Sequence, residues 1–334
     1  MRFLSICGLA TILLSVQPVA AQKVVSGLAS TGAEAAATND PATTTPNATL
    51  PCSDSVSVCI APFYGNARAA LSLTYDDGCI DQYELIAPRM DSLGLRGTFF
   101  LIGKGLGEGA LSWDKIISLD RRGHEIGNHG WTHTDLRKIP SDSVRSELRL
   151  TSDLIAAHIG HRPKSIAPPF NSYDKRVLDI AGELSIAVRT FQKGFGQGKH
   201  FGQGQRYTDF PAMKAWLDGI VRDGKWGVTM VHGIRDGWDK WEHEEDYWNF
   251  LKYAAAAEGL WAAPLAEVAA YRKEAETCSL KVETCPSGAL IITPKCELDE
   301  SLYNMPLTLV IRRGNSVKTI DIDPFGPPVI HFSE

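Results

Sequence analysis

Between about residues 60 and 272, short apolar runs alternate with amphipathic stretches. Two of the amphipathic stretches have helical periodicity, one at 141–159 after Pro140 and one at 244–258 with a single apolar stripe. Repeated strand–helix alternation predicts an α/β fold built on a parallel sheet, either a barrel or an open sheet, with functional residues at the carboxyl ends of its strands. The apolar runs predict seven buried strands, at 70–75, 97–102, 124–128, 164–168, 185–190, 226–231 and 260–263.

The pattern changes on both sides of this region. Residues 1–21 combine Arg2 with an apolar run and small residues, which predicts a signal peptide and a secreted protein, extracellular or periplasmic. No comparable apolar segment follows, so no membrane span is expected. Residues 22–59, rich in Ala, Thr and Ser, predict a flexible leader with a glycosylation sequon at Asn47. The main domain is then expected at 60–275, followed by a small β-rich module at 276–334.

That module is predicted from a change of pattern after about residue 276. Four short strand-like runs occur at 279–285, 289–293, 307–312 and 316–322, separated by Pro, Gly and Asn. This spacing is typical of a small sandwich of β-strands.

Composition and cysteine usage narrow the functional classes. The 334 residues are 44% hydrophobic and carry a net charge of -5, which gives no support for a nucleic-acid partner. Removing Cys7 with the signal peptide leaves six cysteines, an even number that predicts disulfides in an oxidising compartment, with 15 connectivities open. Cys79 is expected to bridge to the late group; a free thiol ligand is the alternative. The cysteines close enough in sequence to pair are Cys52 with Cys59, and the late group Cys278, Cys285 and Cys296.

The run 71–78 ends a predicted strand on two adjacent carboxylates. Leu71, Leu73 and Tyr75 alternate with polar residues before Asp76, Asp77 and Gly78. Neighbouring strand residues point to opposite faces, so the two carboxylates could serve different roles. An ordinary Asp-Asp-Gly turn is the alternative.

Three histidines follow other predicted strands. His129 and His133 are four residues apart, a spacing that lets both imidazoles face one point on a helical turn. Two histidines and a carboxylate form the donor set of a catalytic zinc site, whereas surface histidines are the alternative. His232 ends the strand at 226–231, and hydrogen bonding within a loop is its alternative role. All of these residues follow predicted strands, so they are expected at the same end of the sheet. That shared location favours a functional role over the alternatives.

Four short motifs, in this order, resemble the polysaccharide deacetylase family, carbohydrate esterase family 4, and in particular a divergent secreted branch of it. The motifs are Thr74-Tyr-Asp-Asp-Gly78, His129-Gly-Trp-Thr-His133, Pro168-Pro-Phe170 and Val231-His232. The resemblance covers residues 66–272 and implies a distorted (β/α) barrel of about seven strands. It also implies removal of acetyl groups from sugars with a divalent metal, most commonly Zn²⁺.

Carried over by position, the resemblance implies a role for each motif residue. Asp76 would be the general base, His232 the general acid, and a backbone N–H near Phe170 would stabilise the oxyanion. The residues expected to hold the metal are Asp77, His129 and His133, and those expected to contact substrate are Trp131, Pro169, Phe170 and Trp238.

Two positions depart from the family pattern. Ala167 stands where the family has an arginine that orients the base, and Arg162 or Arg189 is expected to substitute. The family's Asp-rich Trp motif has no match between 185 and 226, where a Gly- and Gln-rich loop at 192–205 lies instead. Asp236 or Asp239 is then expected to support His232.

The sequence therefore predicts a secreted, metal-dependent hydrolase that removes N- or O-acetyl groups from a polysaccharide or oligosaccharide. One alternative is a carbohydrate-binding protein on the same fold with weakened catalysis. Another is a metal-dependent hydrolase of a different C–N amide bond. Retention of both aspartates and all three histidines favours the enzyme, because a binding protein has no need of a base beside a metal.

Overall fold

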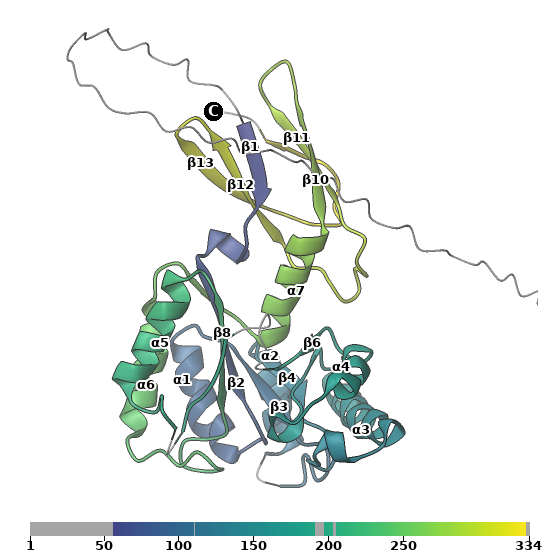
Figure 1. Ribbon diagram of the computed structural model, residues 1–334, viewed down its shortest axis with the longest axis vertical. Coiled ribbons are helices and arrows are strands. Elements are labelled where there is room, and N and C mark those ends of the chain that lie inside the picture. Colours follow the sequence, from purple (N-terminus) through teal and green to yellow (C-terminus); the bar gives the residue numbers. More distant parts are fainter. Residues whose placement is uncertain (1–55, 110, 191–196, 203–204, 332–334) are drawn as a thin grey trace, which may run out of the picture. The chain divides into compact units, whose positions relative to one another are not determined.

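The computed structural model describes residues 56–109, 111–190, 197–202 and 205–331 (Figure 1). The predicted signal peptide, most of the predicted leader, Asn47 and Cys52 lie outside these residues. None of the helices in the described ranges combines the length and the apolarity that a bilayer crossing requires.

The main domain is built on one parallel sheet with strand order β6-β5-β4-β3-β2-β8-β7, and β9 also pairs with β2. All seven predicted strands are present, and the sheet forms a curled half-barrel, so the predicted α/β fold is confirmed. Strands β2, β3 and β8 are buried along their whole length, so the small polar residues of β2, Ser72 and Thr74, are buried together with its apolar ones. The strands are β2 (Ala69–Tyr75), β3 (Gly97–Leu101), β4 (Glu125–Asn128), β5 (Ser165–Ile166), β6 (Ala187–Val188), β7 (Gln197–His200), β8 (Trp226–Val231) and β9 (Leu260–Ala262).

One strand of this sheet was not predicted. Strand β7 lies within the segment 192–205, which the sequence analysis treated as a loop, and it pairs in parallel with β8. Its sequence, Gln-Gly-Lys-His, has no apolar residue, and a strand of this kind gives no periodic signal.

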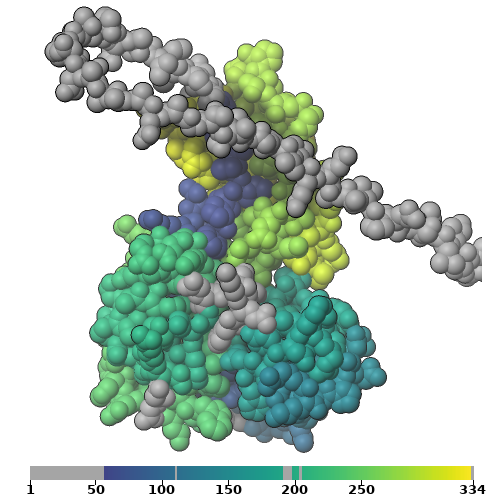
Figure 2. Space-filling model, viewed as in Figure 1, coloured from purple at the N-terminus to yellow at the C-terminus, as the bar shows by residue number. Residues whose placement is uncertain are grey.

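Helices α5 and α6 lie on one side of the sheet and α3 and α4 on the other (Figure 1), and these parts of the chain form the green and teal surfaces of the main domain in Figure 2. Helix α3 has the predicted bounds and ends at Gly160, whose φ of 87° is favourable for glycine at a helix C-terminus. Helix α6 buries the predicted apolar stripe in the core. The helices are α1 (Ala87–Ser92), α2 (Trp113–Arg121), α3 (Ser141–Ile159), α4 (Lys175–Gly182), α5 (Phe210–Arg222), α6 (Glu244–Ala256) and α7 (Leu265–Thr277).

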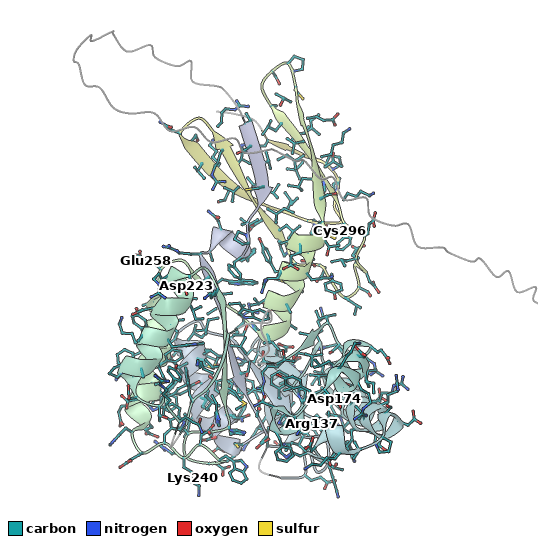
Figure 3. The ribbon with its side chains drawn as sticks, viewed as in Figure 1. Arg137, Asp174, Asp223, Lys240, Glu258 and Cys296 are labelled. Atoms are coloured by element: carbon teal, nitrogen blue, oxygen red, sulfur yellow. A yellow bond between two sulfur atoms is a disulfide. The ribbon has the colours of Figure 1, made fainter. Side chains whose placement is uncertain are left out.

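The loops after the strands lie at one end of the main domain. In Figure 3, Lys240, in the loop that follows β8, lies at the opposite end from Asp223 and Glu258, in the turns that precede β8 and β9. Because all strands of the sheet are parallel, the residues that follow β2, β4 and β8 share the end marked by Lys240.

The β-rich module contains two three-stranded antiparallel sheets that share one buried core. Strands β1 (Val56–Ile60), β12 (Leu307–Arg313) and β13 (Ser316–Ile322) form the first sheet. Strands β10 (Ser279–Thr284), β11 (Leu290–Lys295) and β14 (Val329–His331) form the second. Residues 56–59 were predicted as flexible leader, but the structure pairs them with β12 because Val56, Val58 and Ile60 pack on the shared core.

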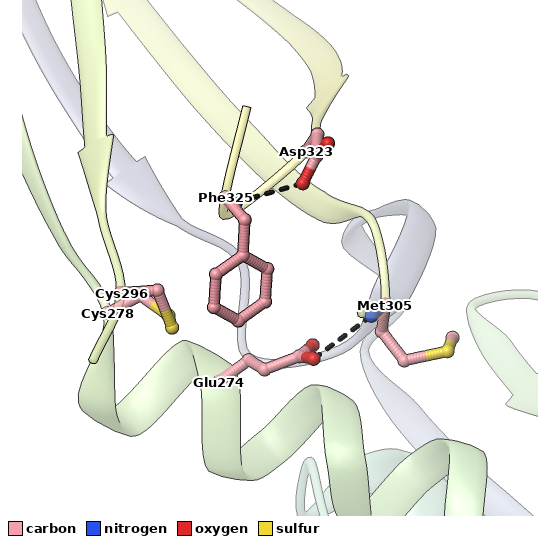
Figure 4. Close-up of a disulfide and its surroundings, with 6 residues drawn as sticks. All are labelled: Glu274, Cys278, Cys296, Met305, Asp323 and Phe325. Atoms are coloured by element: carbon pink, nitrogen blue, oxygen red, sulfur yellow. Dashed lines mark hydrogen bonds between the residues drawn. A yellow bond between two sulfur atoms is a disulfide. The ribbon is translucent and has the colours of Figure 1, made fainter. Parts of the chain in front are cut away.

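The cysteines differ in part from expectation. Cys278 and Cys296 form a disulfide where α7 meets the module (Figure 4). Cys79 is a free thiol, so its predicted bridge to the late group is wrong. The physical reason is location, because Cys79 follows β2 at the rim of the main domain. Burial raises the pKa of its thiol, which disfavours the thiolate that a metal ligand requires.

Candidate metal centre and catalytic rim

The two adjacent aspartates differ in backbone conformation. Strand β2 ends at Tyr75, and the Asp76 N–H continues the pairing by donating to the Val231 carbonyl at 2.9 Å. Asp77 has φ of 72°, a left-handed conformation that a non-glycine residue seldom adopts, and Gly78 follows with φ of 73°. Asp76 thus still belongs to the strand pairing and Asp77 begins a left-handed turn, so the predicted alternation of strand faces does not describe this pair. Such strain is typical of functional sites.

Asp77, His129 and His133 place their ligand atoms within 4.8 Å of one another. Asp77 Oδ1 lies 3.4 Å from Nε2 of His129 and 3.4 Å from Nε2 of His133. Tetrahedral zinc with bonds near 2.0–2.1 Å separates its ligand atoms by about 3.3 Å, so these spacings fit such an ion. Asp77 Oδ1 is also buried, and it has no hydrogen-bond partner among the described residues. A buried carboxylate oxygen in that state fits a cation ligand.

The segment 129–133 is a loop and not the helical turn that was expected. Gly130 has φ of 76° and His133 has φ of 55°, and both values prevent a helix. The Gly130 N–H donates to the side chain of Asn128 at 2.7 Å. Glu147 of α3 accepts from the backbone N–H groups of Trp131 and Thr132 at 2.9 and 2.7 Å. These bonds, rather than helical geometry, bring the two imidazoles together.

The tautomer of His129 suits metal binding. Its Nδ1 lies 2.7 Å from the Ala167 carbonyl oxygen, which can only accept, so Nδ1 carries the proton. Nε2, 3.4 Å from Asp77 Oδ1, then has a lone pair to offer to an ion. Hydrogen bonding of the distal nitrogen to a carbonyl is a common support for a metal-binding histidine.

Asp76 is paired with Arg189 and not with Arg162. The Arg189 guanidinium donates to both oxygens of Asp76 at 2.5 Å, and neither side chain is appreciably exposed. Burial opposes ionisation of Asp76, but Arg189 outweighs it and lowers the pKa of the carboxyl to about 2. Arg162 forms a surface ion pair with Asp153. Of the two expected substitutes for the missing arginine, the structure selects Arg189.

His232 is supported by Asp239 and not by Asp236. Asp239 Oδ2 accepts from the His232 backbone N–H at 2.5 Å and lies 3.0 Å from Nδ1. Burial disfavours the imidazolium, but the bond to Asp239 and the nearby Asp76 outweigh it, so the pKa of His232 is raised. Nε2 of His232 lies 4.0 Å from Asp77 Oδ2. Within the part of the chain that the structure describes, the Asp236 side chain accepts only from the neighbouring Gly237 N–H.

Two buried residues after Asp77 hold the loop that carries His232. Asp81 Oδ2 accepts from the backbone N–H groups of three consecutive residues, 234–236, at 2.6, 2.8 and 3.2 Å. Gln82 Nε2 donates to the carbonyls of Asp76 and His232, both at 2.5 Å. Neither residue was predicted from the sequence. Their partners in the loop after β8 are about 150 positions away, and no local pattern indicates such contacts.

The expected substrate-contacting residues occupy different environments. Phe170 has φ of 59°, is 65% exposed, and its ring centroid lies 4.5 Å from that of His133. Trp238 is 80% exposed. Trp131 packs on Gly103, where an added Cβ would lie 2.5 Å from the indole. Pro169 is buried and lies near Gly130.

The central segment of the chain is similar to known proteins. Residues 65–188 match the family model described as polysaccharide deacetylase. An uncharacterized protein of Bacillus subtilis, YlxY, is 36% identical over 105 residues, which cover 31% of this chain and 32% of that protein. A peptidoglycan-N-acetylglucosamine deacetylase of Bacillus cereus is 30% identical over 123 residues, or 36% of this chain and 43% of that protein. The chain thus spans less than half the length of these relatives.

A solved structure from Mycobacterium smegmatis, provisionally named a polysaccharide deacetylase, has a TM-score of 0.50 at 16% identity. The alignment covers 65% of this chain and 94% of that one, and at this identity it establishes a shared fold. The matched segment 65–188 contains the aspartate pair and both histidines of the candidate metal centre. The chain therefore carries a domain of the polysaccharide deacetylase family, carbohydrate esterase family 4.

Proposed function

We propose that this protein is a secreted, metal-dependent deacetylase that releases acetate from an acetylated polysaccharide or oligosaccharide. The observation that carries the proposal is the clustering of Asp77, His129 and His133, with the Asp77 oxygen buried and unpartnered. Relatives named as chitin and peptidoglycan-N-acetylglucosamine deacetylases support the substrate class. The apolar segment at 1–21 supports secretion.

The ligand set of two imidazoles and one carboxylate favours Zn²⁺ among the common divalent ions. When bound, such an ion supplies Lewis acidity, which polarises the acetyl carbonyl and makes water a stronger acid. Asp77, His129 and His133 would hold it. Asp76 lies beside the cluster, with Oδ2 3.8 Å from Nε2 of His129.

Asp76 is placed to act as the general base. The Arg189 pair keeps it ionised at neutral pH and fixes the orientation of both oxygens. Ionised carboxylates accept hydrogen bonds and protons, so Asp76 orients the attacking water and receives its proton. A backbone N–H near Phe170 would donate to the developing oxyanion.

His232 is placed to act as the general acid. Its raised pKa favours the protonated ring, and Asp239 fixes the ring orientation through Nδ1. Nε2 then delivers its proton to the departing amine or alcohol. The exposed rings of Phe170 and Trp238 offer faces on which sugar C–H groups can stack, and Trp131 and Pro169 complete the proposed substrate contacts.

The test is acetate release from acetylated xylan, chitin oligomers and peptidoglycan, with zinc-loaded protein. We expect release from at least one of these polymers. An Asp76→Asn variant should retain the ion and lose activity, because the amide cannot accept the proton. Saturable sugar binding without any acetate release would contradict the proposal and favour a carbohydrate-binding protein. Release of a product other than acetate would favour a hydrolase of a different amide bond.

A further inference from the structure

A second histidine contacts the carboxylate that supports His232. Asp239 Oδ1 lies 2.6 Å from Nε2 of His200, while Oδ2 lies 3.0 Å from Nδ1 of His232. Asp239 is 2% exposed, and the two imidazole rings are 5.4 Å apart. One buried carboxylate thus joins two imidazoles through different oxygens. His200 is the last residue of β7, the strand without an apolar residue.

The backbone beside His200 is fitted to the same carboxylate. Gly202 has φ of 153°, and an added Cβ there would lie 2.3 Å from Asp239 Oδ1. Only glycine therefore lets the chain after β7 approach so closely. Strand β7 itself is held by four residue pairs with β8, from Gln197 with Gly227 to His200 with Met230. The strand and the glycine together place His200 against Asp239.

The three side chains are spaced closely enough to hold a cation. However, each Asp239 oxygen already lies at hydrogen-bonding distance from an imidazole nitrogen, and Oδ2 also accepts the His232 N–H. These bonds lower the pKa of Asp239 against the opposing effect of burial, as expected of a carboxylate satisfied by donors. A hydrogen-bonded network accounts for the geometry without a second ion.

We propose that His200 is a positioning residue: it donates to Asp239 Oδ1 and fixes the carboxylate in the orientation that holds His232. This inference rests on the proposed role of His232 as general acid. Without His200, Asp239 keeps one imidazole partner and can rotate about its Cβ–Cγ bond. The bond from His232 Nδ1 then loses its fixed acceptor. Loss of such a supporting partner typically lowers activity about 10- to 100-fold.

The effect depends on the leaving group. In amide hydrolysis, water adds to the carbonyl carbon and the C–N bond breaks. The water proton goes to Asp76, and the proton on His232 Nε2 goes to the departing nitrogen. An amine cannot leave as an anion, whereas a phenolate leaves readily without a proton. His200 should therefore matter for an N-acetyl sugar and not for an aryl acetate.

The experiment compares wild type, His200→Ala, His200→Gln and the control His161→Ala, all as the zinc-loaded full chain. His161 pairs with Asp120 on the surface, so its removal breaks an exposed His–Asp contact of similar length. Each variant is assayed with N-acetylglucosamine oligomers and with 4-nitrophenyl acetate. We expect His200→Ala to lower kcat for the oligomers about 10- to 100-fold, with KM, zinc content and aryl acetate hydrolysis unchanged. His200→Gln, whose amide can donate to Asp239, should restore most of the loss.

Equal losses on both substrates, no loss on the oligomers, or two zinc ions per chain with one lost in His200→Ala would overturn the inference. If wild type releases no acetate from the oligomers, the proposed function fails for this substrate class, and hydrogen exchange still tests the role of His200. Asp239 Oδ2 accepts the His232 backbone N–H. Exchange of that amide should be faster in His200→Ala than in wild type and unchanged in His161→Ala. An unchanged rate in His200→Ala would overturn the positioning role.

Discussion

Asp76 and Asp77 are neighbours in sequence, but single side chains give them different surroundings. Asp76 accepts two hydrogen bonds from Arg189, whereas Asp77 Oδ1 has imidazole nitrogens at 3.4 Å and no hydrogen-bond partner. A carboxylate already satisfied by a guanidinium is suited to a fixed base. One without a donor is suited to a cation. The surrounding side chains are therefore the basis for assigning Asp76 as the base and Asp77 as the metal ligand.

Replacement of Arg189 tests the assignment of the base. Arg189→Lys keeps a charge but loses the two-pronged contact with Asp76, so the pKa of Asp76 should rise. Because Asp76 must be ionised to accept a proton, the acidic limb of the kcat/KM profile should move to higher pH, and kcat should fall about 10- to 100-fold. Arg162→Lys alters only a surface pair and serves as the control. Identical pH profiles for both variants would refute the role of Arg189.

Replacement of Asp239 tests whether this carboxylate raises the pKa of His232, the proposed general acid. Asp239→Asn removes the carboxylate that raises the pKa of His232, so that pKa should fall. His232 then loses its proton at lower pH, and the basic limb of the rate profile for an N-acetyl substrate should move to lower pH. Asp236→Asn changes the other candidate in the same loop and should leave the profile in place. A shift in Asp236→Asn instead would reverse the assignment.

Among the elements, those with a strong apolar pattern could be predicted from sequence and those fixed by distant polar contacts could not. The run 70–75 and the helix 141–159 were predicted almost to the residue, because each buries a set of apolar side chains that the sequence pattern reveals. Strand β7 was not predicted, because its pairing with β8 involves only backbone groups. The spacing of His129 and His133 predicted that their imidazoles lie close together, as they do, but it predicted the wrong backbone. Spacing alone cannot distinguish a helical turn from a loop fixed by Glu147.

The loop after β8 depends on one buried carboxylate. Asp81→Ala would leave three backbone N–H groups, of residues 234–236, without their acceptor. We expect a loss of about 1–3 kcal/mol in the free energy of unfolding, measured with urea. Asp236→Ala, in the same loop but with a single local hydrogen bond, should change it much less. Equal effects would show that Asp81 does not hold the loop.

At the scale of the whole molecule, α7 and the β-rich module are joined by specific contacts. The Tyr271 hydroxyl donates to the Ala61 carbonyl at 3.0 Å, and Glu274 Oε1 accepts from the Met305 N–H at 3.0 Å (Figure 4). The sequence predicted the late strands of the module from their local pattern. It missed the membership of β1, because β1 pairs with β12 about 250 positions later and no local signal encodes that pairing.

Glu274 makes this junction sensitive to pH. Burial raises its pKa to about 7, and Oε2 has no hydrogen-bond partner in the described ranges. The native state therefore binds more protons than the unfolded state between pH 4.5 and 7, so the free energy of unfolding falls as pH rises through that window. Glu274→Gln removes the ionisation and keeps a carbonyl for Met305. As pH rises from 4.5 to above 7, the free energy of unfolding of Glu274→Gln should increase relative to that of wild type by on the order of 1–3 kcal/mol.

The control for that comparison is Glu276→Gln, an exposed position on the same helix that pairs with Arg272. Chemical denaturation at several pH values measures the free energy of unfolding of each variant relative to wild type. A stability difference for Glu274→Gln that does not vary with pH would show that Glu274 is ionised alike in both states.

The most direct test of the central claim is calorimetric titration of metal-depleted protein with Zn²⁺. Asp77, His129 and His133 predict about one ion per chain. Asp77→Asn should bind it far more weakly, whereas Asp76→Asn should still bind one ion. Undiminished affinity in Asp77→Asn, or loss of the ion in Asp76→Asn alone, would contradict the account.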